Sequence, residues 1–163
     1  MKPAIKNRLM DVAVGIAAIL AGAAVVHFGD RLLDVRLEYF AGVSTFSPVW
    51  VLDVFVVPCV AGILVSFIYG LGGKILAHLS PVIVRVFSYY EVTNFGSPLP
   101  DDVVVLPMSY WLLVVILSAE FAAVGGLLGE IFVKRTYGRT PKELLHKRYM
   151  KPTLARADEE SKP

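Results

Sequence analysis

The longest apolar stretch of the chain, residues 103–133, constrains the fold most. As an α-helix it would rise about 46 Å at 1.5 Å per residue, which exceeds the ~30 Å hydrocarbon core of a bilayer. Such a run is typical of a membrane-spanning helix that tilts or emerges from the bilayer at one end. Glu120 lies near its middle, where an ionisable side chain is costly and serves either a function or a bond between helices.

The composition extends this interpretation to the whole chain. Hydrophobic residues make up 56% of the 163 residues and charged residues only 18%, and the mean hydropathy is +0.64. That is too apolar for an ordinary soluble domain of this length. We therefore expect an all-α fold, a polytopic integral membrane helical bundle. The single cysteine, Cys59, leaves no partner for an intrachain disulfide or a thiolate metal cluster, and we expect no cofactor.

Four transmembrane helices are predicted within a bundle of residues 1–133, at about residues 10–28, 48–70, 74–90 and 103–133. The first run has a second interpretation, because a basic N-terminus precedes it and Ala21-Gly22-Ala23 fits the cleavage site of a secretory signal. The second run opens with Ser47 as a helix cap and Pro48 in the first helical position.

Two segments permit more than one structure. The third apolar run is short and holds Ser80-Pro81 in its middle, so it is either a kinked span or a helix lying in the membrane interface. Between the first two spans, Leu33, Leu37 and Phe40 recur at helical spacing, which indicates either an amphipathic helix on the outer surface or a loop folded back over the bundle.

The distribution of charge predicts the orientation. Three basic residues precede the first run and nine follow residue 133, whereas the loop of residues 91–102 contains acidic residues and no basic one. Basic residues stay on the cytoplasmic side of a membrane. Both termini are therefore expected in the cytoplasm, which requires an even number of spans and selects four over three. We expect a prokaryotic cytoplasmic (inner) membrane.

Residues 134–163 are predicted to form a basic juxtamembrane helix followed by a disordered tail. The stretch Thr140-Pro141-Lys142-Glu143 is a capping box that would start this helix. Basic side chains at this position attract anionic lipid headgroups, and the positive-inside rule explains them without a nucleic-acid partner. The candidate headgroup ligands are Lys134, Arg135, Arg139, Lys142, Lys147 and Arg148.

The intramembrane polar residues are the candidates for function. Glu120 has three candidate partners, which are Arg85, His78 and His27. It either makes one hydrogen bond to a neighbouring helix or subunit, or takes up protons or cations. Asp53 lies five residues into its span and is expected near headgroup depth. No catalytic motif is present, and we expect no enzymatic activity.

Small residues predict how the helices pack. Gly62, Ser66 and Gly70 recur at four-residue spacing on the second span, as do Gly125 and Gly129 on the fourth. In lipid, close backbone approach over small side chains supplies the packing between helices. These faces either close the bundle internally or dock on another membrane protein.

The region after the last span resembles a known family. Tyr137-Gly138-Arg139-Thr140-Pro141-Lys142, followed by Leu144-Leu145, is similar to the G-x-T-x-G-K stretch that follows the last span in the RDD family of small membrane proteins. Arg8 and Asp11 match that family's Arg and first Asp, although they lie closer together here, and the second Gly of the later motif is replaced. The resemblance implies a membrane protein of a family suspected of transport roles.

These observations predict a non-catalytic integral membrane subunit or interaction protein that packs within a larger membrane complex. Its expected partners are other membrane subunits and anionic lipids. The alternative is an ion or proton transporter that uses Glu120.

Overall fold

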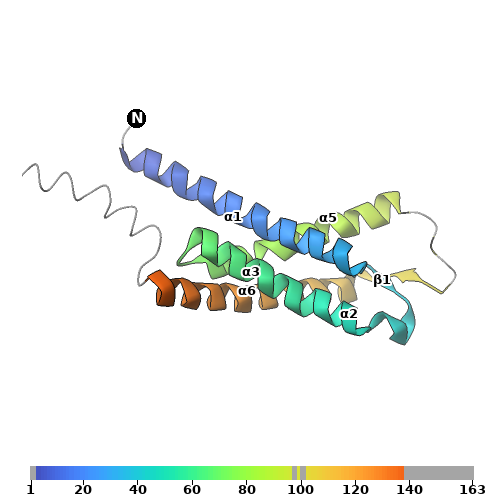
Figure 1. Cartoon of the computed structure of the whole chain (residues 1–163). Coiled ribbons are helices and arrows are strands. Elements are labelled where there is room, and N and C mark those ends of the chain that lie inside the picture. Colours follow the sequence, from blue (N-terminus) through green and yellow to red (C-terminus); the bar gives the residue numbers. More distant parts are fainter. Residues whose placement is uncertain (1–2, 97–98, 100–101, 138–163) are drawn as a thin grey trace, which may run out of the picture.

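The computed structural model describes residues 3–96, 99 and 102–137, and most of them are helical (Figure 1). The helices and strands follow in the order α1 (Pro3–Leu33), β1 (Tyr39–Phe40), the 3-10 turn η1 (Gly42–Thr45), α2 (Pro48–Val51), the π-helical turn η2 (Leu52–Val56), α3 (Val57–Tyr69), α4 (Gly73–Ala77), α5 (Leu79–Phe95), β2 (Val104–Val105) and α6 (Met108–Tyr137). The prediction of an essentially all-α fold is confirmed.

Three helices are long and apolar enough to cross a membrane. They span Leu9–Leu33, Pro48–Tyr69 and Met108–Thr136. The first and second correspond to predicted spans, and the third begins at Met108 instead of residue 103. The reason is local, because Val104–Val105 form a strand and the carbonyl of Pro107 accepts the N–H groups of the first helical turn.

The second of these helices is continuous through α2, η2 and α3, with one wider turn. Ser47 caps its start, since its hydroxyl oxygen accepts the Trp50 N–H at 3.2 Å. The π-helical turn precedes Pro58, which has no N–H to donate to the carbonyl one turn back. This turn contains Asp53, whose side chain is fully buried.

The third predicted span is a helix interrupted near its start. α4 and α5 meet at His78, three residues before Pro81, which has no N–H to donate to the Ala77 carbonyl one turn back. Ser80 ties this point to α1, because its hydroxyl donates to the Ile19 carbonyl at 3.2 Å. α5 then packs against α1 and α6, and it crosses behind α1 in the view of Figure 1.

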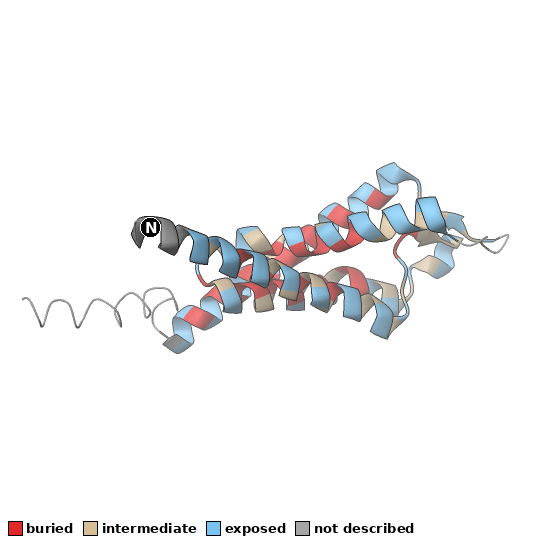
Figure 2. Cartoon of the chain, turned by 90° about the horizontal axis from the view of Figure 1, so that it is seen from above, coloured by how far each residue is buried: buried red, intermediate tan, exposed pale blue. Residues whose placement is uncertain are grey.

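The helices pack around small side chains. Ala18, Val65, Ala77 and Ala122 form one buried cluster, and the buried residues lie along the inner faces of the helices (Figure 2). α3 and α6 share the most extensive contact. The backbones approach closely there, so that a Cβ atom added to Gly62 would overlap the Ala122 carbonyl.

The remaining predicted packing residues lie in or beside this contact. A Cβ atom on Gly125 would overlap the Cys59 carbonyl of α3, and one on Gly129 would lie 2.8 Å from the Ser66 Cβ. Gly70 is different. It ends α3 with φ +84°, a left-handed value that residues with a Cβ rarely adopt, so it terminates the helix instead of continuing its packing face.

The segment between α1 and α2 is a loop folded back over the bundle. The alternative of an amphipathic helix at residues 33–40 is wrong, because Tyr39 and Phe40 pair with Val105 and Val104 in a short antiparallel ladder. Leu37 and Glu38 are consequently buried. The loop thereby covers one end of the helix bundle.

Candidate functional site

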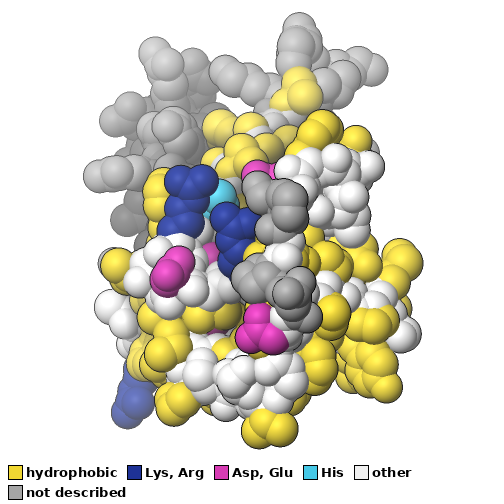
Figure 3. Space-filling model, turned by 90° about the vertical axis from the view of Figure 1, so that its right-hand side faces the viewer, with side chains coloured by type: hydrophobic (Ala, Val, Ile, Leu, Met, Phe, Trp, Pro, Cys, Tyr) yellow, Lys and Arg dark blue, Asp and Glu magenta, His cyan; other side chains and the backbone are white. Residues whose placement is uncertain are grey.

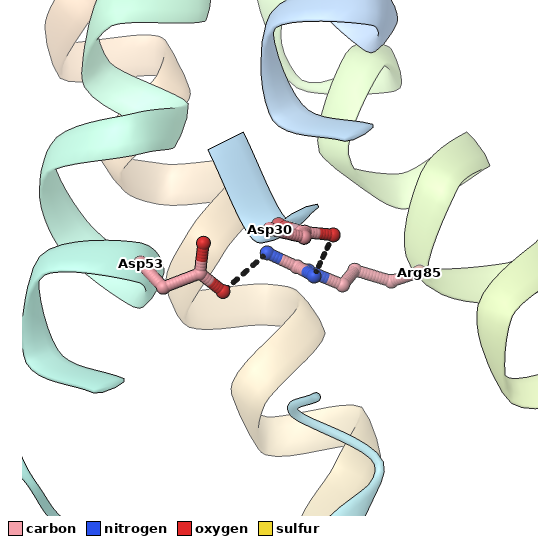
Figure 4. Close-up of polar contacts among 3 residues, drawn as sticks. All are labelled: Asp30, Asp53 and Arg85. Atoms are coloured by element: carbon pink, nitrogen blue, oxygen red, sulfur yellow. Dashed lines mark hydrogen bonds and ion pairs between the residues drawn. The ribbon is translucent and has the colours of Figure 1, made fainter. Parts of the chain in front are cut away.

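Three helical segments each bring one charged residue to a common point inside the bundle (Figure 4). Arg85 of α5 donates from Nη1 to Asp30 Oδ2 of α1 at 2.6 Å, and from Nη2 to Asp53 Oδ2 of η2 at 3.2 Å. The Arg85 and Asp53 side chains are 1% and 0% exposed, and that of Asp30 is 14% exposed. We call these three residues the buried triad.

The local fold explains this convergence. Asp30 lies in the last turn of α1, and Asp53 in the π-helical turn near the start of the next helix. Chain direction alternates between successive helices, so both aspartates lie toward the same end of the bundle. Arg85 is twelve residues beyond Gly73, about 18 Å along the helix, which brings its long side chain within reach of both.

Glu38 approaches the triad from the folded-back loop. Its side chain is 3% exposed. Burial raises the pKa of the Glu38 carboxyl above its usual value, while its own backbone N–H and the Arg85 charge oppose this rise. A third carboxyl group therefore lies in the electrostatic environment of the Arg85 guanidinium.

The triad does not use all of its hydrogen-bonding capacity. Within the described residues, Asp30 Oδ1, Asp53 Oδ1 and Arg85 Nε are buried without a hydrogen-bond partner. The same part of the chain contains no group of three or more His, Cys, Asp or Glu residues arranged to hold a metal ion. The arrangement suits charge neutralisation and proton binding better than nucleophilic chemistry.

The structure separates the predicted partners of Glu120. Its side chain is exposed on α6, and in the described part of the chain it makes no hydrogen bond or ion pair. Arg85 instead pairs with Asp30 and Asp53. His78 contacts the Lys74 carbonyl with Nδ1 at 3.0 Å, and exposed His27 stacks edge-on with Phe28.

Asp53 and Arg85 were among the predicted polar candidates, whereas their partner Asp30 was not. One signal would have found it. Asp30 and Asp53 lie near the same predicted membrane surface, at the end of one span and the start of the next, and Arg85 is the only arginine inside a third. Opposite charges at the same membrane depth attract one another strongly in a medium of low dielectric constant.

Glu130 is a further buried polar residue that the sequence analysis missed. Its Oε1 atom accepts the Gly72 N–H at 2.8 Å and the Lys74 N–H at 3.3 Å. The first amides of a helix have no partner within that helix. Glu130 therefore closes the turn between α3 and α4 and attaches it to α6.

The two ends of the bundle differ in their polar residues. At the end viewed in Figure 3, charged side chains of both signs lie among hydrophobic ones. At the opposite end, Lys134 and Arg135 are exposed in the last turn of α6. The other predicted headgroup ligands, Arg139, Lys142, Lys147 and Arg148, lie outside the described residues, as does the predicted helix that contains three of them.

No protein-family model matches the sequence, and comparisons with curated proteins and with solved structures find no match. The resemblance to the RDD family stays a prediction from its motif residues. Of these, Asp11 lies in α1 and is partly buried.

Proposed function

We propose that this chain is a non-catalytic integral membrane subunit that docks on a transmembrane helix of a different protein through the face of α6 around Glu120. The observation that carries the proposal is the exposure of this carboxyl group in the middle of an apolar surface. Ile116 and Val124, one turn to either side, are 52% and 47% exposed. A carboxyl group facing lipid at this depth is costly, and a partner helix would remove that cost.

The opposite face of α6 is already occupied. Gly125 and Gly129 contact α3, and Glu120 projects about 140–180° away from them at 100° per residue. The small-residue face of α6 is therefore taken up by packing within the bundle. The proposed docking surface is instead the face around Glu120, which carries larger side chains.

The proposed partner is a different protein with a basic or amide side chain at mid-membrane depth. Charge complementarity favours this choice, because a donor or cation satisfies the carboxylate directly. In a symmetric pair of this chain, two Glu120 carboxylates would repel one another at low dielectric.

The proposed topology has four spans, with α4 and α5 together as the third and both termini in the cytoplasm. Support comes from the packing of α5 against both α1 and α6 (Figure 1) and from the basic residues concentrated near both ends of the sequence. Exposed Lys134 and Arg135 would then face anionic headgroups at the inner surface of a prokaryotic cytoplasmic membrane.

The test is the size of the native assembly. We expect the wild-type chain, extracted from its own membrane in mild detergent, to migrate with a second protein. Glu120→Gln should keep this assembly because the amide still donates and accepts, and Glu120→Ala should dissociate it. Phe87→Ala removes an exposed apolar side chain on α5 and should leave the assembly unchanged.

A monomer, a homo-oligomer, or an assembly insensitive to Glu120→Ala would contradict the proposal. The alternative of an ion or proton transporter using Glu120 gives a different result. It requires a flux in vesicles reconstituted with this chain alone, and Glu120→Gln would have to abolish that flux with the fold intact.

A further inference from the structure

The buried triad of Asp30, Asp53 and Arg85 is not needed for docking through Glu120 and calls for its own explanation. It joins α1, η2 and α5 at 2.6 and 3.2 Å, and two of its three side chains are completely or almost completely buried. Such a cluster can be structural, but its charge does not balance.

With all groups ionised, two carboxylates face one guanidinium and leave one net negative charge in a low-dielectric interior. The charged neighbours of Asp53 are Arg85 and Asp30, and those of Glu38 are Arg85, Asp30 and Arg36. On α6, Glu130 accepts the Gly72 and Lys74 N–H groups, and Glu120 is exposed. An uncompensated buried charge is unfavourable, and a carboxyl group in this position neutralises by binding a proton.

The contacts of the individual oxygens indicate where a proton fits. The Oδ2 atoms of both aspartates are occupied by the two Nη atoms of Arg85 (Figure 4). Both Oδ1 atoms are buried without a hydrogen-bond partner. Two carboxylates are acceptors only, so a hydrogen bond between the Asp30 and Asp53 side chains forms only if one of the pair is protonated.

We propose that Asp30 and Asp53 form a proton-binding site that holds one shared proton, so that the triad is electrically neutral. The proton forms an O–H bond on one carboxyl group and is donated to the other, while the guanidinium remains charged and pairs with both. Asp30 is the only one of the three with an appreciably exposed side chain, so the proton exchanges with solvent through Asp30.

The test uses infrared spectroscopy of the full-length protein in lipid, with the carboxyl carbon of aspartate isotopically labelled. At pH 7 we expect a protonated-acid band that shifts with the aspartate label and disappears on titration to alkaline pH. Exposed aspartates ionise near pH 3.9 and contribute no such band at this pH. Asp30→Asn and Asp53→Asn should each abolish the band, and Glu38→Gln and Glu120→Gln should leave it in place.

Absence of a labelled acid band from the wild-type protein at pH 7 would overturn the proposal, whatever the variants do. The wild-type measurement also stands if an asparagine variant fails to fold. Repeating the titration with choline in place of sodium separates two ligands. A band that appears only without sodium would show that a sodium ion occupies the site and would equally overturn the proposal.

Discussion

At the scale of single residues, Arg85 has the largest expected effect on stability. It pairs with two aspartates, and its side chain is 1% exposed. Arg85→Met would leave two buried carboxyl groups without their counter-ion, a change that typically costs about 3–5 kcal/mol. We expect a large fall in the thermal unfolding temperature in detergent. Arg31→Met, at an exposed arginine near the end of α1, is the matched control and should change little.

Burial of the Glu38 carboxyl group predicts that the stability of the folded protein depends on pH. Burial raises the pKa of this carboxyl above its ordinary value of 4.5. Above pH 4.5 the folded state therefore binds more protons than the unfolded state, and this contribution to stability is lost as the pH rises through the folded-state pKa. Glu38→Gln should remove this loss, so that unfolding temperatures at pH 5 and pH 8 lie closer together than in the wild-type protein.

The control for this measurement is Glu91→Gln, at an exposed glutamate on α5. That variant should show the wild-type difference between the two pH values. If Glu38→Gln leaves the difference unchanged, the carboxyl group is not responsible for it.

At the scale of elements, the contact between α3 and α6 depends on glycine. A Cβ atom on Gly62 would overlap the backbone of Ala122, so Gly62→Leu should separate the two helices. Overpacking of this kind costs about 1–3 kcal/mol. We expect a lower unfolding temperature in detergent. Val86→Leu, at a position 50% exposed on α5, should be neutral.

The turn between α3 and α4 gives a second prediction for the elements. Glu130→Ala removes the acceptor of the Gly72 and Lys74 N–H groups, and an unsatisfied buried group costs about 1–3 kcal/mol. Hydrogen exchange at these two amides should increase. Glu120 is an exposed glutamate on the same helix. Glu120→Ala should therefore leave hydrogen exchange at the Gly72 and Lys74 amides at the wild-type rate.

At the scale of the whole molecule, the prediction concerns topology. A reporter that works only in the cytoplasm should be active when fused after Pro163, and a cysteine introduced between α5 and β2 should react with a membrane-impermeant reagent from outside. With the N-terminus in the cytoplasm, both results together require four spans. A C-terminal reporter active only on the outer side would mean that α4 and α5 do not cross the membrane and that the chain has three spans.

Sequence alone predicted the helical fold of this chain and its long apolar helices, because long apolar runs, a Ser-Pro helix start and an interior proline act locally. Small residues at four-residue spacing also marked the faces along which α3 and α6 approach one another. Tertiary structure decided which side chains meet. The rotation of each helix about its axis and the choice of its neighbours depend on packing against the other helices, and no local pattern contains that information.

For this reason Glu120 and Arg85, a natural pair by charge and hydropathy, lie apart. Glu120 projects from α6 on the side opposite to its glycines, and Arg85 turns inward to aspartates from two other helices. The same physical requirement, that a charge in the membrane needs a partner, is met inside the bundle for Arg85, and under the proposed docking another protein meets it at Glu120.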